Sequence, residues 1–192
     1  MKNPLVEFCL RRKIDYDPTC YDFVIVGDGS GLLTNKPCGF HAVILDVEKD
    51  CSWECGGSFT HGSGVAAELL AFYVAIEQVV DSRPGVLSRI LCISDSQVTV
   101  YCAKGLWART ANLALWAAID SYSQRKEVRL FWEHIERNTI ESHAHCDERS
   151  KRWRVLTQNE LWRFEQEQSR EIPQKKKGNK NRRIPPIHRD KA

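Results

Sequence analysis

Apolar residues along the first third of the chain fall into short runs that predict β-strands. Residues 21–31 form an apolar run that enters a glycine-rich turn, and residues 38–47 form a second run after a short loop. Residues 51–62 predict a third, weaker strand. Because the connections between these segments are short, we expect them to pair as antiparallel neighbours.

Farther along the chain, longer apolar patterns predict helices that alternate with strands. Residues 63–81 contain good helix formers, with Ser63 as a plausible N-cap and no helix breaker before Arg83. Two more strands are expected at 90–93 and 127–135, and further helices at 96–103, at 112–124 and from about 142 onward. The resulting order, βββαβαβα, predicts an α/β fold: a five-stranded mixed sheet, with three antiparallel strands followed by two parallel ones, flanked by helices.

Length and composition predict one folded domain with two extensions. The chain has 192 residues, 42% of them hydrophobic, which can supply a single core. We expect the domain at 21–167. It follows an N-terminal extension (1–20), for which the sequence does not settle whether it is ordered, and it precedes a basic tail (168–192). No apolar run approaches the roughly 20 residues that span a bilayer. We therefore expect a cytoplasmic protein without a membrane partner.

Basic charge is concentrated at the end of the chain. Residues 151–192 carry 13 Lys and Arg against 5 Asp and Glu, which leaves 15 against 20 for residues 1–150. The tail has few apolar side chains, so we expect a disordered arm that contacts the phosphates of a nucleic acid. A solubilising tail or a localisation signal remains an open alternative.

Eight cysteines raise the question of disulfides and of zinc. Several lie in apolar stretches, as Cys92 does, where cysteine behaves as a small hydrophobic residue, so we expect reduced thiols. Cys38, His41, Cys51 and Cys55 offer four possible zinc ligands. Their spacing is not a strong zinc signature, and the question stays open.

Four carboxylates stand out because they follow or interrupt apolar sequence: Asp28, Glu68, Asp95 and Asp147. A buried carboxylate without a partner is costly, so each should be protonated, paired with a cation or bound to a metal. A helix cap is the common alternative for Asp95, and an exposed helix position is the alternative for Glu68. If the first and fourth strands are neighbours, these acids could converge into a site for Mg²⁺ or Mn²⁺.

Five segments, in order over residues 22–153, resemble the type 1 ribonuclease H proteins: VIVGDGSG, AAELLAFYVAIE, CISDSQVTV, LWAAIDSYSQRKEVRLFWEHI and HCDERSKRW. The resemblance implies a ribonuclease H fold whose catalytic carboxylates bind two Mg²⁺ or Mn²⁺ ions; these are Asp28, Glu68, Asp95 and Asp147. It also implies an endonuclease that hydrolyses the RNA strand of RNA/DNA hybrids by a two-metal mechanism, leaving 5′-phosphate and 3′-hydroxyl ends.

The resemblance further assigns a catalytic histidine and substrate contacts. A histidine in this family often assists product departure, and His143 is the first candidate for that role. Relatives commonly have asparagine at its position, four residues before the last aspartate, so His145 and His134 are the alternatives. The residues implied to bind substrate are Gly29, Ser30, Asn35, Ser96 and Gln97. One departure puts RNA-strand recognition in doubt: Gly64-Val65 replaces the consecutive asparagines of relatives. There is also no lysine-rich segment between 107 and 112, so we expect any additional contact with the nucleic acid to come from the C-terminal arm.

Other protein classes share parts of these motifs. A haloacid dehalogenase-like phosphatase would need an Asp-x-Asp-Gly-Thr motif, and this segment lacks the first, nucleophilic aspartate; the glycines lack Rossmann spacing. A ribonuclease H-fold nuclease acting on DNA or branched junctions, or a non-catalytic nucleic-acid-binding module, stays open. The four acids argue against the module because an anionic pocket repels phosphates. The oligomeric state is not predicted.

Overall fold

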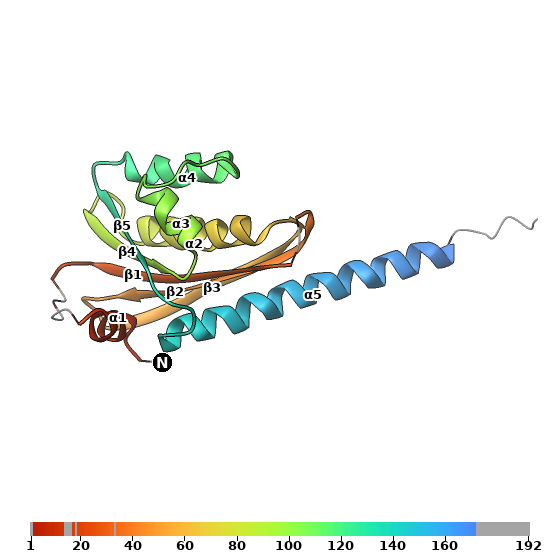
Figure 1. Cartoon of the computed structure of the whole chain (residues 1–192), viewed down its shortest axis with the longest axis horizontal. Helices are drawn as coiled ribbons and strands as arrows, with labels where there is room; N and C mark the ends of the chain where they lie inside the picture. The colour runs from red at the N-terminus through yellow and green to blue at the C-terminus, as the bar shows by residue number, and fades with distance from the viewer. Residues whose placement is uncertain (1, 14–16, 18, 33, 172–192) are drawn as a thin grey trace, which may run out of the picture.

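The computed structural model describes residues 2–13, 17, 19–32 and 34–171, with side chains up to residue 163. One five-stranded sheet forms its centre, with the strand order β3-β2-β1-β4-β5 (Figure 1). The strands are β1 (Phe23–Gly31), β2 (Lys36–Asp46), β3 (Cys51–Gly62), β4 (Ser88–Ser94) and β5 (Val128–His134).

Strand directions follow from the connections. The short turns join β1, β2 and β3 into an antiparallel meander. Strands β4 and β5 are reached through helices, and β1–β4 and β4–β5 pair in parallel. The predicted five-stranded mixed sheet is therefore confirmed, and β1 lies at the centre of the sheet, with the meander on one side and the parallel pair on the other.

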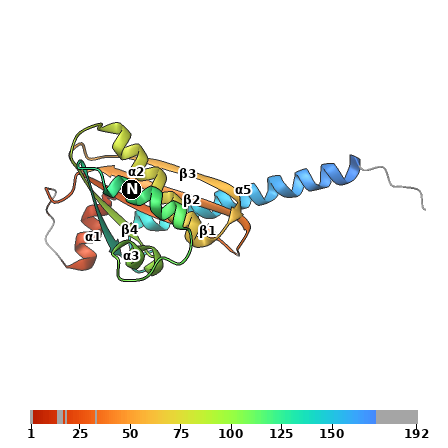
Figure 2. The ribbon, with the colours of Figure 1, turned by 90° about the horizontal axis from the view of Figure 1, so that it is seen from above.

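Helices cover both faces of the sheet. They are α1 (Pro4–Arg12), α2 (Gly64–Ser82), α3 (Gln97–Ala103), α4 (Leu113–Ser123) and α5 (Glu141–Glu171). Figure 1 shows α2, α3 and α4 on one side of the sheet and α1 and α5 on the other. Both views show α5 running well past the end of the sheet (Figures 1 and 2).

Two hydrophobic cores lie on opposite faces of the sheet. Along β1, Phe23 and Ile25 belong to the core under α2, whereas Val24 and Val26 belong to the core on the α1 and α5 side. Successive side chains of a strand point to opposite faces, so a strand covered on both sides needs an unbroken apolar run. The apolar run predicted as the first strand reflects this double burial.

The N-terminal residues, whose order the sequence left open, form α1 and join the second core. Asn3 caps the helix by accepting hydrogen bonds from the backbone amides of Leu5 and Val6. Leu5, Phe8 and Cys9 are buried, with the spacing of one helical face. Residues 4–12 therefore contribute to the packed structure.

The other end of the chain differs from the sequence-based boundary. Helix α5 continues past residue 167 to Glu171. The rest of the predicted basic tail, residues 172–192, lies outside the described residues. None of the eight cysteines, all within the described part of the chain, forms a disulfide. Among the same residues, no helix is long and apolar enough to cross a membrane.

Candidate active site

Glu68 is fixed between β1 and β4 by a close approach of helix α2. A Cβ atom on Gly29 would lie 2.1 Å from the backbone nitrogen of Glu68, so only glycine permits this contact. One Glu68 oxygen accepts a hydrogen bond from the Gly29 amide at 2.7 Å, and the other accepts one from the Ser94 hydroxyl. The buried carboxylate therefore lies next to the end of β1 and is not an exposed helix position.

Asp28 and Asp95 meet because β1 and β4 are parallel neighbours. Val26 pairs with Ile93, and each aspartate follows two residues later. Ser96, not Asp95, caps α3: its Oγ accepts a hydrogen bond from the Thr99 amide at 3.2 Å. The carboxylate of Asp95 is thus free to face the other acids.

Helix α5 supplies the remaining groups from one face. His143, Asp147 and Ser150 follow the spacing i, i+4, i+7. The Nε2 atom of His143 lies 3.4 Å from Asp95 Oδ1 and 3.9 Å from Asp28 Oδ1. The Ser150 hydroxyl donates a hydrogen bond of 2.5 Å to Asp28 Oδ2.

Two cations hold Asp147. Arg137 Nη2 donates a hydrogen bond of 2.5 Å to Asp147 Oδ1, and Lys151 Nζ donates one of 2.6 Å to Oδ2. The Nε atom of the same arginine lies 3.8 Å from Asp95 Oδ2. Because one guanidinium contacts both carboxylates, Asp147 belongs to the same group of acids as Asp95.

Burial and mutual repulsion disfavour the charged forms of the two innermost acids. Burial raises the pKa of Asp28 to about 6, although the Ser150 hydrogen bond and His143 act in the opposite direction. Burial raises the pKa of Glu68 well above its usual value, and the negative charge of Asp28 adds to this effect. A cation beside these two carboxylates would stabilise their ionised forms.

The outer two acids behave differently. Burial alone would raise the pKa of Asp95 and of Asp147, but their partners outweigh it. His143 lowers the pKa of Asp95, and Lys151 and Arg137 lower that of Asp147. These two side chains are therefore ionised at neutral pH and present negative charge at the rim of the site.

The donor set fits a divalent cation. One ligand atom each from Asp28, Asp95 and His143 lies within 4.8 Å of the other two. His143 is fully buried, and neither of its ring nitrogens has a hydrogen-bond partner among the described residues. Carboxylate oxygens are the ligands that Mg²⁺ and Mn²⁺ prefer. The fit therefore rests on oxygen donors, with one imidazole beside them.

Three of the predicted substrate-binding residues adjoin the acids directly. Gly29 follows Asp28 in β1, and Ser96 and Gln97 follow Asp95 at the start of α3. Gln97 is exposed and lines a surface depression of about 510 Å³ together with Arg11, Arg12 and His134. Ser30, the fourth, is buried at the end of β1.

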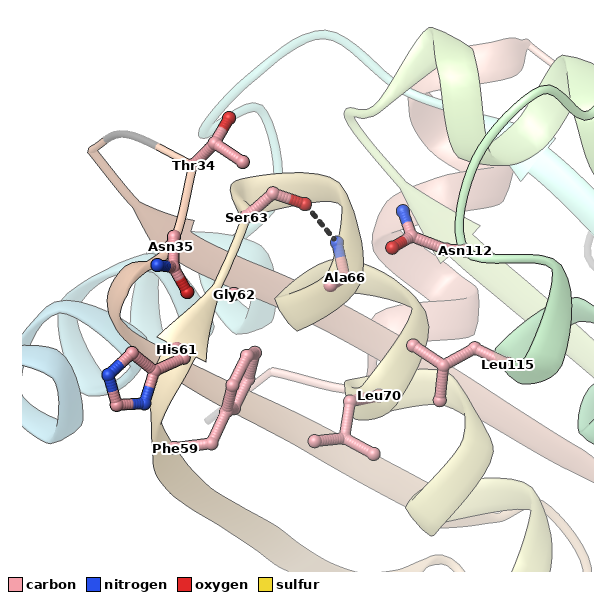
Figure 3. Close-up of a pocket in the computed structure, with 10 residues that line it drawn as sticks. All are labelled: Thr34, Asn35, Phe59, His61, Gly62, Ser63, Ala66, Leu70, Asn112 and Leu115. Carbon is pink, nitrogen blue, oxygen red and sulfur yellow. Dashed lines mark hydrogen bonds between the residues drawn. The ribbon is translucent and has the colours of Figure 1, made fainter.

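Asn35, the fifth predicted substrate contact, lies in a different depression. Its backbone has a left-handed conformation (φ 61°), and its amide donates a hydrogen bond of 2.7 Å to the Gly62 carbonyl. Figure 3 shows the pocket of about 440 Å³ that it lines, with Ser63 at the start of α2 and Asn112 before α4 across from it. The structure therefore does not gather Asn35 with the four acids.

The alternative histidines have other partners. His134 Nε2 lies 3.1 Å from the backbone carbonyl of Asp95. His145 points to Glu54, with Nε2 3.0 Å from Oε1. His143 itself lies in the first turn of α5 rather than in the preceding loop, and its full burial keeps it from solvent.

Sequence reasoning missed three polar residues of the site. Ser150 lies one turn after Asp147, so helical spacing could have indicated it. Ser94 immediately precedes Asp95, so its position in the sequence could have indicated it as well. Arg137 lies in the loop before α5 and carried no signal, because loop conformation decides where its guanidinium goes.

The four zinc candidates of the sequence do not gather. Two groups of three potential metal ligands exist within the described part of the chain, and neither contains a cysteine. His41 belongs to the second group, with Glu54 and His145. A zinc site built from Cys38, Cys51 and Cys55 with His41 is therefore not supported.

Comparison with known proteins identifies the fold. No family model matches the sequence, and no curated protein matches it significantly. Solved structures do match. The N-terminal ribonuclease H domain of a Mycobacterium tuberculosis protein, solved as a fusion with maltose-binding protein, superposes with a TM-score of 0.60 at 18% identity, covering 73% of this chain and 99% of that one.

Two further structures give the same result. LC11 ribonuclease H1, isolated from compost and solved with an RNA/DNA hybrid, has a TM-score of 0.60 at 22% identity, covering 70% of this chain and 97% of that one. Ribonuclease H1 from the archaeon Halobacterium salinarum has a TM-score of 0.55 at 18% identity, and the match covers 68% of this chain and 96% of that one. The chain has the ribonuclease H fold.

Proposed function

We propose that this ribonuclease H fold is a metal-dependent endonuclease that hydrolyses the RNA strand of RNA/DNA hybrids. The observation that carries the proposal is the convergence of Asp28, Glu68, Asp95 and Asp147 from β1, α2, the end of β4 and α5. Four acids beside one another have no use in a surface that only binds phosphates, because they repel them. The RNA/DNA hybrid in the LC11 structure supports the choice of substrate.

The carboxylates would hold two divalent ions, Mg²⁺ or Mn²⁺. When bound, such ions make a water molecule nucleophilic and stabilise the charge on the departing 3′ oxygen. In-line attack by water on the phosphodiester would leave 5′-phosphate and 3′-hydroxyl ends. The protein's part is to fix the oxygen ligands, and the hydrogen bonds from Gly29, Ser94 and Ser150 to Glu68 and Asp28 serve this purpose.

His143 acts as a positioning residue in this proposal. Its ring is enclosed between Asp28 and Asp95 and has no exposed surface, so it cannot reach a nucleic acid from this position. It restricts the orientation of both carboxylates. This role differs from that of a mobile histidine that assists product departure.

Arg137 has to change partners when the site is loaded. It contacts Asp147 and Asp95 through the oxygens that would bind cations, and its side chain is 60% exposed. An exposed guanidinium released by a metal is free to contact a phosphate of the substrate. The arginine would thus exchange a carboxylate for a nucleic-acid phosphate at the same site.

A substrate panel tests the proposal. The full chain is incubated with labelled RNA/DNA hybrid, duplex DNA, duplex RNA and a branched junction, each with Mg²⁺ or Mn²⁺. We expect cleavage of the RNA strand of the hybrid. Asp95→Asn should lower the rate by at least about 100-fold, or roughly 2.7 kcal/mol in barrier height, because it removes a ligand charge.

The matched control is Asp81→Asn, which changes an exposed aspartate near the end of α2 and should leave the rate unchanged. Circular dichroism verifies that both variants fold. Equal rates for Asp95→Asn and Asp81→Asn would remove the acids from the chemistry and refute the nuclease.

A second candidate is a nuclease of this fold that cuts DNA or a branched junction. It is favoured by Gly64-Val65 at the start of α2, where hybrid-cleaving relatives are expected to have asparagines that contact the substrate. The same panel separates the two candidates, because this alternative predicts faster cleavage of the junction or of duplex DNA than of the hybrid.

A further inference from the structure

A second cluster of metal-ligand side chains lies outside the four acids. It comprises His41 on β2, Glu54 on β3 and His145 on α5. The two glutamate oxygens each face one imidazole: Oε2 lies 3.0 Å from His41 Nε2, and Oε1 lies 3.0 Å from His145 Nε2. The three ligand atoms lie within 4.8 Å of one another.

Close packing holds His41 in place. Its side chain is only 3% exposed, and its Nδ1 atom has no hydrogen-bond partner among the described residues. A Cβ atom on Gly56, the register partner of His41, would lie 2.5 Å from Nδ1 and 2.8 Å from Trp153 Nε1. The ring therefore fills a narrow space with Nε2 directed at Glu54.

The contact between Glu54 and His145 is not a hydrogen bond. Nε2 of this ring is buried and close to Glu54 Oε1, yet the geometry does not make a hydrogen bond between them. The two imidazoles lie at 69° to each other, with centroids 5.6 Å apart. His41 Nε2 makes a hydrogen bond with Glu54 Oε2, whereas His145 Nε2 has no hydrogen-bond partner among the described residues. A buried imidazole nitrogen without such a partner, directed at a carboxylate, is available as a metal ligand.

We propose that His41, Glu54 and His145 bind one transition-metal ion, Zn²⁺ in particular, at a site separate from the four acids. Two imidazoles and one carboxylate are a known zinc ligand set, whereas Mg²⁺ prefers oxygen alone. Tetrahedral zinc with bonds of about 2.1 Å places its ligand atoms about 3.4 Å apart. The three ligand atoms now lie within 4.8 Å of one another, and each imidazole faces a different Glu54 oxygen, so metal binding would draw the ligands together and reorient the carboxylate.

The site is open on one side. Glu54 and His145 are each about one-third exposed, at 35% and 34%, so an ion can enter and a water molecule can complete the coordination. The cluster joins three elements that are distant in sequence. Metal binding would therefore tie the first turns of α5 to β2 and β3.

This link matters for the neighbouring acids. His145 lies between His143 and Asp147 in α5, and His41 is the register partner of Asp28 in the β1–β2 pair. The inference does not depend on nuclease activity, since it concerns metal binding and the stability of α5. Its measurements can therefore succeed or fail independently of the proposed function.

A zinc titration tests the site. The full chain carries Cys20→Ser and Cys51→Ser, because these are the two exposed thiols and would otherwise bind zinc themselves. Calorimetric titration with Zn²⁺ is performed after chelation and in excess Mg²⁺, which occupies oxygen sites. We expect one Zn²⁺ per chain and a higher melting temperature with zinc than without.

Two variants remove one ligand each and leave the buried His41 itself unsubstituted: Glu54→Gln and His145→Ala. Each should weaken zinc binding by at least about 100-fold, since even residues behind the ligands typically contribute 10–100-fold. His61→Ala, which changes an exposed histidine of β3, and Asp95→Asn, at the four acids, should leave zinc affinity unchanged.

The outcomes decide the proposal directly. Zinc affinity that is unchanged in both Glu54→Gln and His145→Ala overturns it. Loss of zinc binding in Asp95→Asn also overturns it, because the ion would then belong to the four acids. Absence of any zinc-induced rise in melting temperature in the parent chain would reduce the cluster to a Glu54 carboxylate between two imidazoles.

Discussion

At the scale of single residues, each acid of the candidate site has its own partners. Asp28 accepts a hydrogen bond from Ser150, Glu68 from a backbone amide and a serine, and Asp147 from two cations. Burial raises the pKa of the two innermost acids, Asp28 and Glu68, whereas Lys151 and Arg137 lower the pKa of Asp147. The site thus combines fixed oxygen ligands with exchangeable basic side chains.

Ser150 gives a prediction at this scale. Ser150→Ala removes the hydrogen bond to Asp28 Oδ2 in a fully buried position, without adding volume. We expect the Mg²⁺ concentration for half-maximal hybrid cleavage to rise about tenfold, because groups behind metal ligands typically contribute 10–100-fold in affinity. The rate at saturating Mg²⁺ should change much less.

The control for this variant is Ser121→Ala, at an exposed helix position where the hydroxyl bonds only the Ala118 carbonyl. It should leave the Mg²⁺ dependence unaltered. If Ser150→Ala lowers the saturated rate without moving the Mg²⁺ midpoint, the serine does not orient a metal ligand.

At the scale of elements, the site depends on how closely two helices approach the sheet. Gly29 brings α2 against β1, and Gly39 does the same for α5 and β2. A Cβ atom on Gly39 would lie 2.1 Å from the Ser150 carbonyl oxygen and 2.5 Å from the Arg154 amide. These are backbone atoms, so the whole helix would have to move.

Gly39→Ala is therefore expected to displace α5 and to lower the free energy of unfolding by about 2–3 kcal/mol, as overpacking does. Cleavage should fall with it, because α5 carries Asp147. Gly57→Ala is the matched change in the neighbouring strand, where a Cβ would meet only the Phe40 ring at 3.1 Å. Urea unfolding midpoints of the two variants measure the difference.

A smaller or equal loss for Gly39→Ala than for Gly57→Ala would contradict the tight contact of α5 with β2. Normal cleavage by a clearly destabilised Gly39→Ala variant would separate the position of α5 from the chemistry.

At the scale of the whole molecule, charge is divided between a domain with a net negative balance and a basic end. Residues 172–192 contain eight Lys and Arg against one Asp. A substrate bound at an acidic site needs favourable charge elsewhere to offset repulsion. The C-terminal residues offer that charge, although their structure lies outside the described part of the chain.

Deleting residues 172–192 should weaken binding of a hybrid to the Asp95→Asn variant, which is used because we expect it to cleave at least about 100-fold more slowly. The slope of the logarithm of the association constant against the logarithm of salt concentration should become shallower, by about 0.9 for each phosphate that the tail neutralises, if the hybrid behaves as a B-form duplex does. Fluorescence anisotropy at several salt concentrations measures this slope.

The control is a full-length variant in which the eight basic residues of 172–192 are changed to Gln, and its salt slope should resemble that of the truncated chain. A slope equal to that of the unchanged full chain would exclude the tail from binding.

Local sequence patterns determined much of the fold. Apolar runs predicted four of the strands, and the third was expected as a weaker one; Ser63 marked the start of α2. Strand burial and helix capping depend on residues close together in the chain. The sequence left the order of α1 open, since its helix is short and is stabilised by packing against the sheet.

The candidate site was predictable only in part. The sequence itself picked out the acids, because a carboxylate next to apolar sequence is unusual wherever it occurs. Only the tertiary structure decided that Asp28 and Asp95 face one another, that His143 is enclosed beside them and that His145 turns to Glu54 instead. Contacts between distant residues depend on strand register and helix packing, which no local pattern encodes.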